Sequence, residues 1–575
     1  MRDVPTMEGT MTRPLLARPL LCLILLLVCY ATHASTEASS PPLPPSTLYG
    51  PLFVAVQNAR LFADEKTFAD MDPIGPPDQI VETYARMKSQ RGFNLSAFVY
   101  QHFVPAHRAP APAPADTRVD IDTHIETLWS ELERAPDSPA SPFSSQLALP
   151  RPYLAPGTRF NEIRYWDSYF LMLGLEADGR HAQAMNQIDD IASLIDRYGY
   201  MPASNRSYDL SRSSPPFFSL MVDLVARHDG AQAYRRYRPE LELEYAYWMD
   251  GASRLVSGAA WRRAVRLSDG SVLNRYWDDN ATPRDTSYRS DMALAQRVDG
   301  ATQAATAKRT EALLRNLRAS DESGWPASSR WMSDPKRAST LRTMSLIPVD
   351  LNALLYHLEI TLAHAYRVEG DRAHAENMLL RAAQRKSAMQ RLMWDSQIGA
   401  FSDLDWMTGK LTHDLTAATL YPLFAHVATS AQAATVAQTT REKLLASGGV
   451  VTSTVASGAR WDAPFGWAPI QWIGIVGFGE YDHADLARTI AKRWVSTNLD
   501  AYARTGRLSE KYDVVAPAHN ARLIASEMST SSIGETGVSP VDHGAGWTAG
   551  VLRGVLATYP GIASAPASAA PATRP

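Results

Sequence analysis

The sequence predicts a mostly α-helical protein, built as one large domain in which helical hairpins carry functional loops at one end. Apolar residues recur at helical spacing in several stretches, and the alternation that marks β-strands is scarce. The intervals between the helical stretches are long and rich in Trp, Tyr, Asp, Gly and Pro. Because loops on a rigid scaffold usually carry binding and catalytic residues, we expect the chemistry in these intervals.

The first 34 residues are predicted to be a signal peptide. Arg13 and Arg18 precede the apolar run Leu20–Val28, and cleavage is expected near Ala34. The run is too short to be a stable membrane anchor, and Met11 is an alternative start of translation. We therefore expect a protein that is exported through this segment, to the periplasm if the source is Gram-negative, and that carries no membrane anchor.

Composition limits the kinds of partner and cofactor. The chain of 575 residues has a formal charge of −3, which argues against a nucleic-acid partner because phosphates require a basic surface. Both cysteines, Cys22 and Cys29, lie in the signal peptide, so disulfides and cysteine chemistry are excluded from the mature chain. His357 and His364 lie seven residues apart without an accompanying metal motif. We expect no metal and no cofactor, and a monomer that acts on a small molecule.

After the signal peptide, the sequence divides into a linker, a domain and a tail. Residues 35–48 are a Pro/Ser-rich linker, residues 49–560 the ordered domain, and residues 561–575 a disordered tail rich in Ala, Pro and Ser. Within the domain, residues 351–394 read as a helical hairpin that turns at Gly370, and another helix ends at Gly199. A further helix is predicted to close at Trp494. A first helix is marked by the apolar stripe Ile121, Ile125, Leu128 and Leu132.

Three loops combine tryptophan with charged side chains, namely Pro156–Phe170, Glu322–Trp331 and Trp461–Trp472. A fourth, Leu508–Val514, carries acids at positions 510 and 513 around Lys511. The second loop reads ESGWPASSRW and cannot continue the helix before it, since glycine and proline both oppose helix formation. Two interpretations of this loop stay open. It lines a pocket for a polyhydroxylated ligand, with indole rings as apolar faces, or it is a surface loop whose two tryptophans anchor it in the core.

At these loops the chain resembles the trehalase family of glycoside hydrolases. Residues 156–170 (PGTRFNEIRYWDSYF) and 461–469 (WDAPFGWAP) are close to the two signature patterns of that family. Other matches, in the family's order, are residues 50–72, SRSSPPFF, LNRYWDDNATPR and SEKYD, so the resemblance covers roughly residues 49–552. It implies an (α/α)6 toroid and hydrolysis of α,α-trehalose to two glucose molecules with inversion at the anomeric carbon.

The resemblance also implies roles for individual residues. Inverting glycosidases use one carboxylic acid to protonate the leaving oxygen and one carboxylate to activate water. The resemblance places the general base at Glu510. The positions that it implies for contacts with the substrate are Arg159, Phe160, Trp166, Asp167, Arg212, Ser213, Arg284 and Gly324.

The match fails at the general acid. The family has Asp in the fifth position of ESGWDFSSRW, and this chain has Pro326, which carries no proton to donate. Ala203, Ser214 and Thr286 stand where the family has polar contacts to the sugar, and Val538 replaces a Glu. Arg460 and Phe465 are further changes, in and beside the second signature. The acidic residues that are candidates to replace the lost carboxyl groups are Asp321, Glu322 and Glu535.

Loss of a general acid costs on the order of 10²–10⁴-fold in rate. The sequence therefore predicts an exported trehalase whose activity is impaired. The alternative is a catalytically dead relative that binds trehalose or another disaccharide. A glycosidase with another acid and shifted specificity, and a structural protein with an empty pocket, also remain open.

Overall fold

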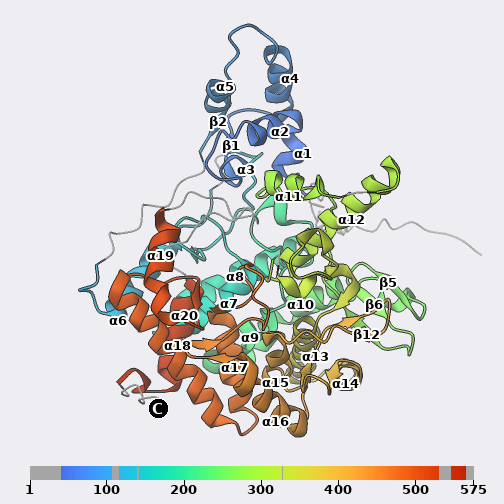
Figure 1. Ribbon diagram of the computed structural model, residues 1–575, viewed down its shortest axis with the longest axis vertical. Coiled ribbons are helices and arrows are strands. Elements are labelled where there is room, and N and C mark those ends of the chain that lie inside the picture. The colour runs from blue at the N-terminus through green and yellow to red at the C-terminus, as the bar shows by residue number, and fades with distance from the viewer. Residues whose placement is uncertain are drawn as a thin grey trace, which may run out of the picture. The chain divides into compact units, whose positions relative to one another are not determined.

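The computed structural model describes residues 41–105, 116–138, 141–298, 300–326, 328–529 and 546–564, which all lie, apart from Pro41, in one compact unit, Pro42–Pro575 (Figure 1). The predicted signal peptide and Glu535 lie outside these ranges. Within them, no helix is long and apolar enough to cross a membrane.

Six helices form a closed ring, because each contacts the next and the last contacts the first. Their side chains are largely buried, as expected for helices surrounded by others. One of them, α15, is a single turn that continues a 3₁₀ segment, Ala417–Leu420. In order around the ring they are α7 (Tyr165–Ala177), α9 (Phe218–Asp229), α13 (Val349–Glu369), α15 (Tyr421–Phe424), α17 (Ala468–Gly479) and α20 (Gly546–Thr558).

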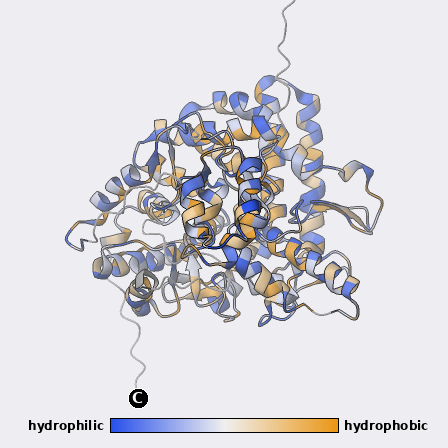
Figure 2. Cartoon of the chain, turned by 90° about the horizontal axis from the view of Figure 1, so that it is seen from above, coloured by the Kyte–Doolittle hydropathy of each residue, from blue (hydrophilic) through white to orange (hydrophobic). Residues whose placement is uncertain are grey.

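A second set of helices alternates with the ring along the chain. Most of these helices pack on the ring helix that is their neighbour in the sequence, and many helices carry both hydrophobic and hydrophilic segments (Figure 2). The second set consists of α6 (Ile121–Leu132), α8 (His181–Tyr198), α10 (Ala231–Trp248), α14 (Arg372–Leu392), α16 (Ser430–Thr439) and α18 (Ala484–Thr505). Other helices are α11 (Tyr288–Ala295), α12 (Gln303–Glu322) and α19 (Asn520–Ser529).

The predicted helices are confirmed, with one wrong boundary. Gly199 and Gly370 end α8 and α13 in the left-handed conformation, with φ of 80° and 84°. Asp371 then caps α14 by accepting a hydrogen bond from the His374 amide. The helix predicted to close at Trp494 instead continues to Thr505 in α18, and Gly506 ends it.

The strands are two or three residues long and connect loops to one another. β15 (Phe465–Trp467) pairs antiparallel with β16 (Lys511–Asp513), which places the loop Trp461–Trp472 beside the segment Leu508–Val514. The remaining pairings are β1–β2, β3–β4, β9–β10, β13–β14, β5–β6–β7 and β8–β11–β12. Their strands are β1 (Asp72–Pro73), β2 (Phe103–Val104), β3 (Glu133–Arg134), β4 (Tyr153–Leu154), β5 (Ala259–Trp261), β6 (Ala264–Arg266), β7 (Val272–Asn274), β8 (Leu346–Ile347), β9 (Trp394–Asp395), β10 (Ala400–Phe401), β11 (Leu404–Asp405), β12 (Lys410–Leu411), β13 (Leu445–Ala446) and β14 (Gly449–Val450).

The N-terminal residues form a layer with its own small aromatic core. It contains α1 (Pro45–Tyr49), α2 (Pro51–Asn58), α3 (Thr67–Asp70), α4 (Pro77–Met87) and α5 (Leu95–His102). Part of the predicted linker, residues 35–48, lies among the described residues, where the Ser46 amide and hydroxyl in α1 both donate to Asp285. At the other end, Ile562 is buried, two residues past the predicted end of the domain.

Closure of the ring depends on a close crossing of α7 and α20 at glycines. A Cβ at Gly550 would lie 1.9 Å from the Phe170 carbonyl oxygen, and one at Gly174 would lie 2.6 Å from the Gly550 Cα. Such distances cannot be tolerated without moving the backbone.

Gly550→Ala should therefore destabilise the protein by about 1–3 kcal/mol or more, because the two helices must separate. Gly479→Ala is the matched control, since nothing lies within 4 Å of its added methyl group. Thermal unfolding followed by circular dichroism should show a lower Tm for the first variant alone. Equal Tm values for the two variants would show that α7 and α20 do not approach each other as closely as described at Gly550.

Candidate active site

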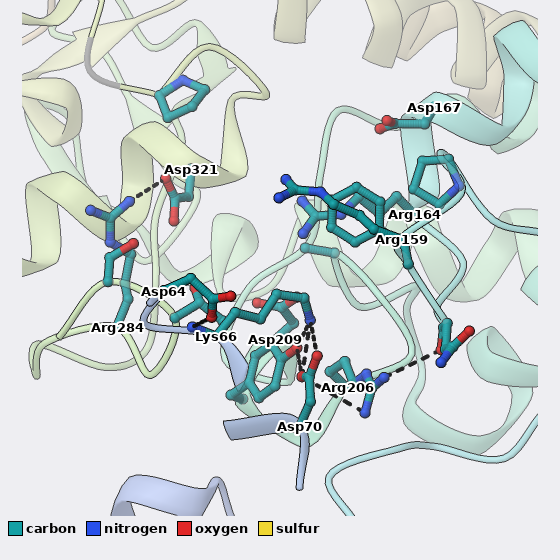
Figure 3. Close-up of a pocket in the computed structure, with 18 of the residues that line it drawn as sticks. Asp64, Lys66, Asp70, Arg159, Arg164, Asp167, Arg206, Asp209, Arg284 and Asp321 are labelled. Carbon is teal, nitrogen blue, oxygen red and sulfur yellow. Dashed lines mark hydrogen bonds and ion pairs between the residues drawn. The ribbon is translucent and has the colours of Figure 1, made fainter. Parts of the chain in front are cut away.

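A cavity of about 760 Å³ opens among the loops that lead into the ring helices. Its lining comes from five parts of the chain: the loop before α7, the loop before α9, the end of α12, the segment around β15 and the residue before β16. Figure 3 shows Arg284 and Asp321 together on one side, and Arg159, Arg164 and Asp167 on the other. Cationic, anionic and aromatic groups thus converge on one enclosed space.

Stacked tryptophans build one wall of the cavity. The rings of Trp461 and Trp467 are 4.1 Å apart and nearly parallel, and Trp547 meets both edge-on. Trp166 meets Trp547 edge-on at 5.7 Å. Such rigid aromatic surfaces suit the C–H faces of a sugar ring.

The ESGWPASSRW loop combines both interpretations that the sequence left open. Trp325 and Trp331 are fully buried, and the indole N–H of Trp331 donates to the Trp325 carbonyl. Gly324 and Pro326, on either side of Trp325, line the cavity. Gly324 has φ of 72°, and a Cβ there would lie 2.9 Å from the ring of Trp166. The tryptophans of this loop anchor it in the core, and its small residues face the cavity.

Glu510 lies at the end of the β15–β16 pair, and its carboxylate is not free. Arg460 Nη2 donates to Glu510 Oε2 at 2.5 Å, and both side chains are partly open to the cavity. Burial alone would raise the pKa of Glu510. The positive charges of Arg460, Arg159 and Lys511 outweigh burial and lower the pKa of this carboxyl.

Arg159, Phe160 and Asp167 lie around the start of α7. The Arg159 guanidinium lies over the Phe160 ring at 4.7 Å and forms no ion pair with any described residue. Asp167 likewise forms no ion pair within the described ranges. Burial raises its pKa to about 6, although Arg164 opposes the shift. Both polar groups are therefore available to a ligand.

The two carboxyl groups that precede Pro326 in the chain have different surroundings. Asp321 lines the cavity, and its oxygens lie 2.6 Å from Arg284 and 3.6 Å from Arg212. Glu322 is fully buried and does not line the cavity, because it accepts hydrogen bonds from Arg263 and from backbone amides.

The cavity brings together all but one of the positions that the resemblance implied. Ser213 is the exception, because its hydroxyl donates to the Met201 carbonyl, and its neighbour Ser214 lines the cavity instead. Those that line the cavity are Arg159, Phe160, Trp166, Asp167, Arg212, Arg284, Gly324, Pro326 and Glu510.

Sequence reasoning missed the contribution of the N-terminal layer. Lys66 and Asp70 line the cavity, and Lys66 Nζ lies 2.7 Å from the buried Glu162 and 2.6 Å from the Tyr208 hydroxyl. Arg206 bonds the same Glu162 carboxylate. The match of residues 50–72 to the family signalled that this segment matters, but it assigned no role to these side chains.

Comparisons with known proteins agree on one family. The family model described as "Trehalase" matches residues 60–560. The periplasmic trehalase of Citrobacter koseri is 41% identical over 545 residues, covering 95% of this chain and 92% of that protein. That of Escherichia coli is 41% identical over 535 residues, covering 93% and 91%. Among solved structures, the neutral trehalase Nth1 of Saccharomyces cerevisiae is similar with a TM-score of 0.56 and 26% identity, covering 70% of this chain and 73% of that one.

Asp167 should make stability depend on pH in a defined direction. A pKa raised from 3.8 to about 6 means that the native state disfavours the carboxylate, by about 3 kcal/mol when it is fully ionised. At about pH 3 and below, under the unfolded-state pKa of 3.8, the carboxyl is protonated in both states, and the cost disappears.

Asp167→Asn should therefore be more stable than the wild type by roughly 2–3 kcal/mol near pH 7.5 and equal to it at about pH 3. Urea unfolding at the two pH values measures the difference. A difference that does not change with pH would show that the carboxylate is not disfavoured in the fold.

Proposed function

The chain belongs to the trehalase family of glycoside hydrolases and has its (α/α)6 toroid fold, and we propose that it is an exported α,α-trehalase of reduced activity. The observation that carries the proposal is the convergence of Glu510, Arg159 and the tryptophan wall on one cavity, at the positions expected from the family. The reduced activity follows from Pro326, which stands in the lining where a proton donor is needed.

In the proposed reaction, Glu510 accepts a proton from water while the water oxygen attacks an anomeric carbon of trehalose. The glycosidic C–O bond breaks, configuration at that carbon inverts, and the departing oxygen takes up a proton. Arg159 and Asp167, neither ion-paired to a described residue, bind hydroxyl groups of the sugar, and the indole rings of Trp166 and Trp461 face its apolar side. Two glucose molecules result.

The proton for the leaving oxygen has no dedicated donor at position 326. Asp321 is committed to Arg284 and Arg212, and Glu322 faces away from the cavity. Asp167, whose pKa is raised, lies across the cavity from Asp321 and close enough to Glu510 for their charges to interact, so in the proposed function it binds a sugar hydroxyl (Figure 3). We propose that, with no described carboxyl group at the position of the family's acid, the proton comes from water. Water is a far weaker acid than a carboxylic acid, so the expected loss in rate is about 10²–10⁴-fold.

The ion pair of Arg460 with Glu510 is expected to lower the catalytic rate further. A base must be free to accept a proton, and the pair lowers the proton affinity of the Glu510 carboxylate. Substrate binding must separate the two groups, or water must use the other carboxylate oxygen.

Pro326 and the ion pair of Arg460 with Glu510 also favour a second candidate function, in which the protein binds trehalose or another disaccharide and does not cleave it. An ion-paired carboxylate and a proline still offer a shaped, polar surface to a sugar. The unpaired Arg159 and the aromatic wall require no chemistry to bind hydroxyl groups.

Export to the periplasm is part of the proposal. The two bacterial relatives, both named periplasmic trehalase, support it, together with the predicted signal peptide at residues 1–34. We propose that the mature chain acts as a monomer, without a metal or cofactor in the reaction, on a freely diffusing disaccharide.

Glucose release from trehalose by the purified protein tests the function. We expect slow release, and Glu510→Gln should lower kcat by at least roughly 10²-fold because the amide cannot act as the base. The Escherichia coli periplasmic trehalase serves as the reference enzyme.

Two other outcomes decide against hydrolysis. If trehalose binds by calorimetry but no glucose forms above the rate of Glu510→Gln, the binding function replaces the enzymatic one. If trehalose neither binds nor reacts, the proposed substrate is wrong.

A further inference from the structure

A cluster of histidine and carboxylate side chains lies at the end of α7 that is away from the cavity. Glu176 in the last turn of α7, His181 at the start of α8, and His228 and Asp229 at the end of α9 come together there. Asp167 and Glu176 are nine residues apart on α7, which places the cluster roughly 14 Å along the helix axis from the cavity. The cluster is therefore separate from the candidate active site.

The nitrogen atoms of two imidazoles converge on one carboxylate. His228 Nδ1 lies 2.8 Å from Asp229 Oδ1, and His181 Nε2 lies 3.3 Å from the same oxygen. The two rings are stacked, with centroids 3.9 Å apart. One ligand atom from each of these three residues lies within 4.8 Å of the others.

Glu176 fixes the orientation of His181. Glu176 Oε1 lies 2.7 Å from His181 Nδ1, and since a carboxylate only accepts, the ring nitrogen donates. In the neutral imidazole Nε2 then carries a lone pair, which faces the Asp229 oxygen. Two lone-pair-bearing atoms at this distance are stabilised by a cation between them. A carboxylate that holds the far nitrogen of a histidine is also the usual support of a metal-binding imidazole.

The cluster is accessible from solvent. The side chains of His181, Asp229 and His228 are 20%, 30% and 65% exposed, so an ion can reach all three.

We propose that His181, His228 and Asp229 form a binding site for a divalent transition metal of the zinc type, with Glu176 as the positioning residue. Two imidazoles and one carboxylate are a ligand set that zinc accepts, and water completes the tetrahedron. A modest closure of the side chains brings the ligand atoms to tetrahedral spacing, and zinc replaces the proton between His228 and Asp229. The metal joins α8 and α9, Glu176 of α7 contacts it only through His181, and it takes no part in hydrolysis.

Calorimetric titration of the untagged, chelator-treated protein with zinc chloride tests the site. We expect one equivalent to bind, and His181→Ala and His228→Ala should each weaken affinity at least tenfold. Glu176→Gln should weaken it roughly 10–100-fold, as expected for a carboxylate behind a ligating histidine. Magnesium should not bind, because it requires oxygen ligands.

His374→Ala is the matched control. His374 Nδ1 also lies 2.7 Å from a carboxylate, that of Asp371, but no third ligand accompanies them among the described residues. This variant should bind zinc as the wild type does. Zinc should raise Tm in the wild type and in His374→Ala, and not in His181→Ala. The absence of saturable binding, or equal affinity in all variants with unchanged zinc-free Tm, would overturn the proposal.

Discussion

The rim of the cavity depends on one buried carboxylate, that of Glu322. It accepts a hydrogen bond from Arg263 at 2.7 Å and from the backbone amides of Ser213 and Trp277 at 2.9 and 2.7 Å. Three segments distant in the sequence are thereby held to the end of α12. Because breaking a buried charged network typically costs several kcal/mol, this carboxylate must point inward. That requirement explains why an acid only four residues from Pro326 does not serve as the proton donor.

The residues that maintain the fold are present in this chain. They form the ring of helices, the glycine crossing of α7 and α20, the buried tryptophans and the hydrogen-bond network of Glu322. The departures from the family pattern at Pro326 and Arg460 lie on the cavity surface, and in the proposed function the first removes the proton donor and the second restrains the base. Residues that face an open cavity can change without unfolding the protein, because they fill no core. A chain can therefore retain the family fold and sugar-binding surface while its catalytic rate falls.

Much of this arrangement follows from the sequence. Helical periodicity located the hairpin of α13 and α14, and the loop motifs located the cavity, because both depend on residues close together in the chain. The sequence did not show which of Ser213 and Ser214 faces the cavity, since that depends on a hydrogen bond to Met201. Nor did it reveal that Arg460 pairs with Glu510, fifty residues away. Contacts between distant segments also explain why the histidine cluster went unnoticed.

In the proposed function, the base Glu510 remains in the cavity, and none of the described carboxyl groups donates the proton to the leaving oxygen. Hydrolysis of α-D-glucosyl fluoride, compared with that of trehalose, tests it most directly, because fluoride leaves without being protonated. We expect the fluoride to be hydrolysed, Glu510→Gln to abolish this activity, and trehalose to react at least roughly 10²-fold more slowly. Pro326→Asp should narrow this difference in rate, and Pro326→Asn should not. If the wild type hydrolysed trehalose as fast as the fluoride, the cavity would have to contain a proton donor, and the proposed loss of that donor would be wrong.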